Sequence, residues 1–303
     1  MPILNSVAEC LSYIDVCTVE YPVLSEIINP NDRLAWEVKL AAVESLDDFI
    51  LGRVQQEKNP EDEESPDVDS APVEYTPQPE DTKLNLLNVT ITAGLCMANG
   101  YETDHCQHAR RLLTKLSLYL NNFPGLKSDK NFLGKIKNLI GLNFLATLSE
   151  LSLAYKLSSG GLDITFETPF ILPGTTKRKD VDLTVRSSTG QVFHLEVYMP
   201  GKSAHDGFFD LKDDDRHFEY KVWKKLADKF GKKEISELNG LVLLAVNIAF
   251  MDMLRIKSTF DSLHNNYDAL TQLIPSHIDG LILFVDDFGA DNSFCFDRLL
   301  LSK

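Results

Sequence analysis

Asp182 and Glu196 lie on two neighbouring segments in which apolar and polar residues alternate. A period of two is typical of β-strands, whose successive side chains point to opposite faces, and it predicts strands at 181–186 and 192–198. A hairpin centred on Thr189 would place the two acids directly opposite each other. Carboxylates in that position repel each other, at a cost on the order of a fraction of a kcal/mol or more, so we expect a cation between them. Hard oxygen ligands of this kind suit Mg²⁺ or Mn²⁺.

A third acid, Glu150, borders the apolar stripe of a predicted helix at 142–158. An acid near the buried side of a helix usually needs a partner, which a metal ion or a lysine can supply. The alternative is that Glu150 is an ordinary polar helix residue and that the two strand acids line the solvent side of a hairpin. We interpret Asp180 as a flanking acid and His194 as a solvent-facing histidine.

Three runs resemble the core of the PD-(D/E)xK nuclease superfamily, especially its Holliday-junction-resolvase-like members: SELSLAYKLSSGG, KDVDLTV and STGQVFHLEVY. The resemblance covers about residues 130–290 and implies a restriction-endonuclease-like α/β fold, a mixed sheet flanked by helices. It also implies metal-dependent hydrolysis of phosphodiester bonds. Glu150, Asp182 and Glu196 would hold Mg²⁺ (or Mn²⁺), with the backbone carbonyl of Val197 as a further ligand. The implied partner is nucleic acid, DNA rather than RNA.

Tyr198 stands where that family has a lysine, which orients the attacking water and stabilises the developing negative charge. A tyrosine is neutral at pH 7, because its ordinary pKa is about 10. Either a lysine from elsewhere reaches the site or the site has lost catalysis and kept binding. The candidate lysines are Lys202, just after the strand, and Lys221, Lys224 and Lys225 on the next helix. The second option makes the chain a catalytically degenerate binding or assembly protein.

A basic helix is predicted at 216–230, and its lysines recur at i, i+4 spacing, Lys221 with Lys225 and Lys225 with Lys229. These lysines either contact phosphate beside the acids or form a solvated helix face. We favour the solvated face for most of them and keep Lys221 as the site candidate.

The elements that must position these residues follow in the order helix, three-strand meander, helix, strand, helix, strand. This order predicts an α/β domain with a mixed sheet over 126–303. Its remaining strands are expected at 163–171, 241–250 and 280–287, and its last helix near 256–273.

Residues 55–82 carry ten acids, one lysine and five prolines. This composition predicts a disordered linker. It separates a helical segment at 1–54 from a second helical segment at 83–125, which packs with the first and contains helices at 83–98 and 103–121. In the first segment, helical spacing predicts an apolar helix face made by Leu34, Val38, Ala41, Ala42, Leu46 and Ile50.

Composition and charge set limits on the partners of this chain, which has 303 residues and a formal net charge of −15. Residues 1–125 hold 8 basic and 21 acidic residues, and residues 126–303 hold 22 and 24. The acidity argues against broad non-specific nucleic-acid binding but leaves room for a local groove in the second part. No apolar stretch reaches about 18 residues, so no membrane span is expected. The five cysteines are spread without a CxxC motif, which favours reduced thiols and a cytoplasmic location.

Some questions of assembly stay open at this point. The chain could form a homodimer, and the helical N-terminal region could bind a protein partner. A third functional hypothesis is an acidic interaction protein, in which residues 55–82 mimic the charge of nucleic acid or dock on a basic partner.

Overall fold

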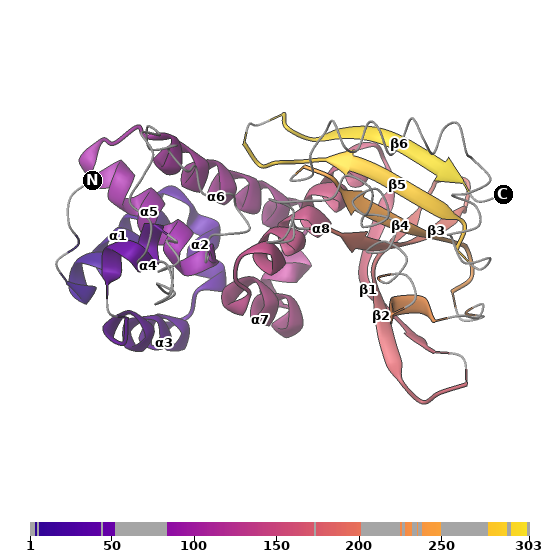
Figure 1. The fold of residues 1–303 in the computed structure, drawn as a ribbon, viewed down its shortest axis with the longest axis horizontal. Helices are drawn as coiled ribbons and strands as arrows, with labels where there is room; N and C mark the ends of the chain where they lie inside the picture. Colours follow the sequence, from indigo (N-terminus) through magenta and orange to yellow (C-terminus); the bar gives the residue numbers. More distant parts are fainter. Residues whose placement is uncertain are drawn as a thin grey trace, which may run out of the picture. The chain divides into compact units, whose positions relative to one another are not determined.

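Two compact units make up the chain in a computed structural model, Met1–Phe144 and Leu145–Lys303 (Figure 1). The predicted start of the α/β domain at residue 126 falls inside the first unit. The predicted linker at 55–82 and the predicted helix at 256–273 lie outside the described residues. The structure describes residues 4, 6–43, 45–51, 84–172, 174–200, 225, 228–231, 235, 238–249, 278–289 and 292–301.

The first unit is helical. Its central helix is buried on every side along most of its length and is capped by Asn85. The Asn85 side chain accepts from the Asn88 N–H, and the Asn88 side chain accepts from the Asn85 N–H, which is a capping box. This central helix is α5, and it packs against α1, α4, α6 and α7. The elements are α1 (Val7–Glu20), α2 (Pro22–Ile27), α3 (Pro30–Ala41), α4 (Leu46–Leu51), α5 (Leu86–Asn99), α6 (Asp104–Asn122), the 3-10 helix η2 (Pro124–Ser128) and α7 (Lys130–Asn138).

The buried face of α3 differs from the predicted one. Leu34 and Val38 are 61% and 65% exposed, whereas Trp36 and Leu40 are buried. Both pairs have i, i+4 spacing, so the periodicity fits either face, and the larger aromatic surface of Trp36 is the one that packs. The chain also breaks after α3 and starts the separate helix α4, so the predicted stripe does not belong to one continuous helix.

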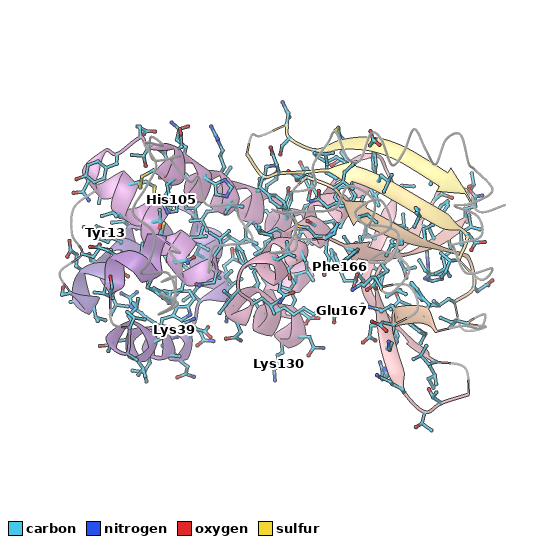
Figure 2. All side chains as sticks on the ribbon, viewed as in Figure 1. Tyr13, Lys39, His105, Lys130, Phe166 and Glu167 are labelled. Atoms are coloured by element: carbon cyan, nitrogen blue, oxygen red, sulfur yellow. A yellow bond between two sulfur atoms is a disulfide. The ribbon has the colours of Figure 1, made fainter. Side chains whose placement is uncertain are left out.

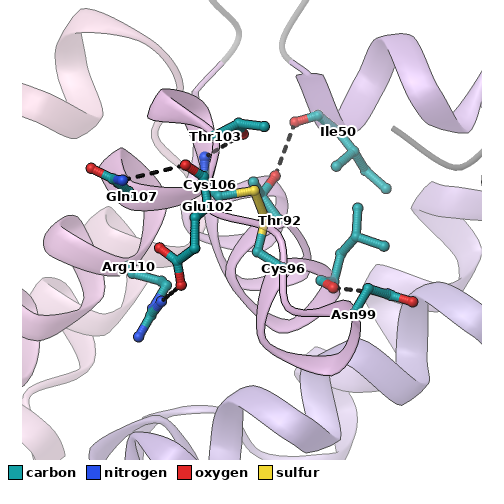
Figure 3. Close-up of a disulfide and its surroundings, with 10 residues drawn as sticks. Ile50, Thr92, Cys96, Asn99, Glu102, Thr103, Cys106, Gln107 and Arg110 are labelled. Carbon is teal, nitrogen blue, oxygen red and sulfur yellow. Dashed lines mark hydrogen bonds and ion pairs between the residues drawn. A yellow bond between two sulfur atoms is a disulfide. The ribbon is translucent and has the colours of Figure 1, made fainter.

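A disulfide joins Cys96 at the end of α5 to Cys106 in the first turns of α6 (Figure 3). The expectation of reduced thiols is therefore wrong for this pair. Gly100 ends α5 in the left-handed conformation, and the Thr103 side chain caps α6, so the chain turns back within a few residues. This turn brings the two Cα atoms to 5.7 Å. Cys10, Cys17 and Cys295 are free thiols.

Within the described residues, the second unit is an α/β body with a six-stranded mixed sheet. The sequence predicts the α/β class and the mixed sheet, but only five of the strands. The strands lie in chain order, β1 to β6. Neighbours pair antiparallel from β1 to β3, parallel from β3 to β5, and antiparallel again between β5 and β6. The elements are α8 (Leu142–Ser159), β1 (Asp163–Ile171), β2 (Arg178–Arg186), β3 (Val192–Tyr198), β4 (Leu241–Asn247), β5 (Gly280–Val285) and β6 (Cys295–Leu301).

Both faces of the sheet are covered around β4, which explains its uninterrupted apolar sequence. On one face Val242, Leu244 and Val246 join a core cluster that includes Phe230. On the other face the Asn247 side chain donates to Ser149 Oγ of α8 at 2.8 Å. Within the described part of the chain, no helix is long and apolar enough to cross a bilayer.

We predict that Gly94→Ala destabilises the first unit. A Cβ at Gly94 in α5 would lie 2.0 Å from the carbonyl oxygen of Tyr13 in α1, so the two helices must move apart. The expected loss is about 3 kcal/mol or more of unfolding free energy, measured by urea denaturation followed by circular dichroism. The matched control is Gly134→Ala in α7, where a Cβ meets nothing within 4 Å and should stabilise by about 0.5–1 kcal/mol. Equal urea midpoints for the two variants would contradict this packing.

Candidate active site

Asp182 and Glu196 meet where β2 and β3 part. The backbone pairing of the two strands runs from Arg186↔Val192 to Leu183↔Leu195 and stops there, one step before Asp182 would pair with Glu196. Instead, the Val197 N–H donates to Asp182 Oδ2 at 2.7 Å. The Asp182 side chain thus takes the place of a backbone partner, and its carboxylate is fixed beside Glu196.

The pairing between β1 and β2 is also interrupted at Asp182. It passes from Phe166↔Leu183 directly to Thr168↔Val181. Glu167 lies between the two β1 partners with φ of +52°, a conformation that residues other than glycine rarely adopt. Asp182 therefore occupies a position that backbone hydrogen bonds leave open on both sides, which is how a strand residue can turn its carboxylate toward a site (Figure 2 labels Phe166 and Glu167).

Two lysines neutralise the buried carboxylate of Glu196, whose side chain is 1% exposed. Lys225 Nζ lies 3.0 Å from Oε1, and Lys229 Nζ lies 2.6 Å from Oε2. Lys229 Nζ is also 3.6 Å from Asp182 Oδ1. The oxygens of both acids therefore converge on a single ammonium group.

The electrostatics of this cluster are dominated by burial. The pKa of Glu196 is raised to about 7, because burial and the neighbouring Asp182 raise it by more than Lys229 and Lys225 lower it. Burial alone would lower the pKa of Lys225, but Glu196, Asp182 and also Glu150 raise it above its ordinary value. Close to neutral pH the site therefore holds a carboxyl group near its titration point beside two ammonium groups.

Tyr198 on β3 lies next to Lys225. The Lys225 ammonium lies 5.6 Å from the centre of the Tyr198 ring, within the range of a cation–π interaction. Burial raises the pKa of Tyr198, so its phenol stays neutral at pH 7. The Lys225 ammonium thus lies between the Glu196 carboxylate and an aromatic ring.

The sequence did not point to Lys229 as a site lysine, whereas Lys225 was among the lysines of the predicted basic helix that are candidates to reach the acids. They are four residues apart, so they share one helix face, and Lys225 and Asp228–Phe230 are helical. The spacing was visible in the sequence, but it fits a solvated face equally well. The two lysines that were preferred, Lys202 and Lys221, lie outside the described residues.

Glu150 on α8 is partly buried, and its charge is one of the smaller causes of the raised pKa of Lys225. Among the residues that the structure describes, no three His, Cys, Asp or Glu side chains form a group that could hold a metal ion. The three-acid ligand set of Glu150, Asp182 and Glu196 therefore stays a prediction.

The helix that carries Glu150 is held against the parallel strands by buried hydrogen bonds. Ser149 Oγ accepts from Asn247 at the end of β4. Ser152 Oγ donates to the carboxylate of Asp286, which follows β5 and is fully buried. Ser149 and Ser152 flank Glu150 in the sequence of α8, so these contacts fix the position of Glu150 relative to the ends of β4 and β5.

His194 is buried, which corrects the expectation of a solvent-facing histidine. It is 5% exposed, and its Nδ1 lies 2.9 Å from Thr184 Oγ1 on β2. Thr184 in turn donates to Thr168 on β1 at 2.7 Å. Burial lowers the pKa of His194, so the ring stays neutral and ties the three strands together next to the acids.

Comparisons with protein-family models, with curated proteins and with solved structures found no match. The class of protein therefore has to be inferred from the cluster of Asp182, Glu196, Lys225 and Lys229 and from the mixed sheet that carries it.

We predict that Lys229→Met raises the pKa of Glu196 above 7, since it removes the cation 2.6 Å from Oε2. Carbon-13 NMR of labelled glutamate measures this pKa. The folded state holds this proton more tightly than the unfolded state does. The contribution of Glu196 to the free energy of unfolding therefore falls as the pH rises from about 4.5 to about 7, and this contribution no longer changes at higher pH. The exposed Lys130→Met should leave the pKa unchanged. A Glu196 carboxyl that titrates near 4.5 in the folded wild type would refute the desolvated site.

Proposed function

We propose that this protein is a metal-dependent nuclease that hydrolyses phosphodiester bonds in nucleic acid. The observation that carries the proposal is the buried cluster in which Asp182 and Glu196 converge on Lys229. A buried ion pair is a poor way to stabilise a fold, because desolvation offsets most of the Coulomb attraction. Buried charges with displaced pKa values are instead typical of catalytic sites.

The donor atoms fit a hard divalent cation. The two carboxylates present only oxygen atoms, and they already converge on one positive charge. Mg²⁺ binds proteins through one or two carboxylates and completes its shell with water and phosphate oxygens, so a third acid is not required. Asp182 and Glu196 would hold the ion, with the Val197 carbonyl and Glu150 as the further ligands expected from the sequence. When bound, the ion supplies a water of lowered pKa and neutralises phosphate charge.

The residues of the chain have separate tasks in this proposal. The Val197 N–H holds the Asp182 carboxylate in place. Lys229 holds the two acids together through its contacts with both carboxylates, and with a metal ion held by the acids its ammonium group would be available to phosphate. Lys225, positioned by the Tyr198 ring, stabilises the negative charge that develops on the phosphate.

We predict that Asp182→Asn abolishes Mg²⁺-dependent nicking of plasmid DNA, with a loss of about 100-fold or more, because it removes a charge that holds the ion. The variant keeps an oxygen that accepts the Val197 N–H, so the fold should survive. Asp180→Asn, two residues along the same strand and exposed, is the matched control and should cut like the wild type. Cleavage that persists in EDTA, or in the Asp182 variant, would end this proposal.

The second candidate is a nuclease-fold binding protein without catalysis. The observation that favours it is that both oxygens of Glu196 are already paired with lysines. Calorimetric titration with Mn²⁺ separates the two candidates. The nuclease proposal predicts binding in the wild type that Glu196→Gln removes, whereas a site without metal chemistry predicts no heat that depends on Glu196.

The remaining sequence hypotheses stay predictions. The acidic segment 55–82 lies outside the described residues, so the structure does not bear on an interaction role for it. The homodimer and the partner of the helical region are untested too. The cytoplasmic location was expected because the cysteines were expected to be reduced. The Cys96–Cys106 disulfide removes this argument.

A further inference from the structure

Two strands of the sheet continue past the site as a ribbon. Pairing of β2 with β3 ends at Leu183↔Leu195, but pairing of β1 with β2 continues to Ile171↔Arg178. Figure 1 shows this hairpin running on beyond the other strands. Its turn is closed by hydrogen bonds, with the Leu172 N–H donating to the Lys177 carbonyl at 3.1 Å. We call residues 168–172 and 174–181 the arm.

The arm is fixed to the helix end that carries the site lysines. Phe170 is buried and stacks on Phe230 with ring centres 5.9 Å apart. Lys179 Nζ donates to the backbone carbonyl of Asp228, and Val181 is fully buried in the same core cluster. Because Phe230 directly follows Lys229, the position of the arm is set relative to the acid–lysine cluster.

The arm carries more cations than anions, because Asp180 is its one acid. Lys177, Arg178 and Lys179 are consecutive, and the first two are exposed. Within the described residues, neither Lys177 nor Arg178 has a side-chain ion pair or hydrogen bond. Burial and the nearby charges of Lys177 and Lys229 lower the pKa of Lys179, while Asp228 and Glu196 oppose this shift. The exposed Lys177 and Arg178 are therefore the two cations of the arm that a polyanion can reach.

We propose that the arm binds the phosphate backbone along the major groove of double-stranded B-form DNA and guides one strand to the Glu196 cluster. This inference rests on the proposed function, because it assigns the substrate of that site. A two-stranded ribbon fits the major groove of B-DNA, about 12 Å wide. The major groove of duplex RNA is deep and narrow, so it excludes such a ribbon.

The test is the salt dependence of binding by the full chain to a short DNA duplex in EDTA, where no cleavage interferes. We expect Arg178→Gln to reduce the slope of log K against log salt by about 1 and the affinity at 100 mM salt by about tenfold. Arg186→Gln is the matched control, since Arg186 is exposed at the opposite end of the same strand. It should bind like the wild type. On duplex RNA of the same sequence, the two variants should have equal slopes.

Equal salt slopes for the two variants on DNA would overturn the proposed role of the arm. An equal loss of slope by Arg178→Gln on DNA and on RNA would overturn it too. Nicking of plasmid DNA with Mg²⁺ is measured on the same preparations. If the wild type nicks and Arg178→Gln keeps the full salt slope, the proposed DNA binding by the arm is wrong and the proposed nuclease function stands. If the salt slope falls as expected but the wild type never nicks, the proposed nuclease activity is wrong and the arm remains a DNA-binding element.

Discussion

The charge of Glu196 inside the second unit is the constraint on which the site depends. A carboxylate that is 1% exposed is stable only if cations reach both of its oxygens, and Lys225 and Lys229 do so. Removing one partner from such a pair costs roughly 3–5 kcal/mol, because the remaining charge stays buried. The helix end that bears the lysines and the strand that bears Glu196 must therefore be held in a fixed relation, which the Phe170–Phe230 stack helps to provide.

The same constraint explains the irregular backbone around Asp182. A second carboxylate next to Glu196 raises the electrostatic cost, so its presence requires local compensation. The Val197 N–H and the shared Lys229 ammonium provide it. The strands open at this residue, and the opening is what allows two acids and two lysines to share one place. A fold selected for stability alone would fill it with apolar residues.

Much of this arrangement follows from the sequence, and the failures have identifiable causes. Period-two alternation predicted the bounds of β1 and β3 and a hairpin register that brings Asp182 beside Glu196, because strand parity is a local property. The expected direct pairing of the two acids is not formed, since the pairing of β2 with β3 stops at Leu183↔Leu195. The roles of Lys225 and Lys229 depend on how a helix is rotated against the sheet, which is a tertiary property. The strand β6 was missed because its sequence has charged residues at its centre and exposed apolar ones, Phe296 and Leu299, as an edge strand permits. The Cys96–Cys106 disulfide depends on a helix–turn–helix geometry that cysteine spacing alone does not reveal.

The central claim is that two acids and one ammonium mark a cation site. A crystal structure with Mn²⁺, with anomalous scattering recorded at the manganese edge, tests it most directly. The account predicts one anomalous peak bound by the carboxylates of Asp182 and Glu196, with the Lys229 ammonium displaced from between them. A map without a peak at these residues, with Lys229 still bridging the two acids, would contradict it.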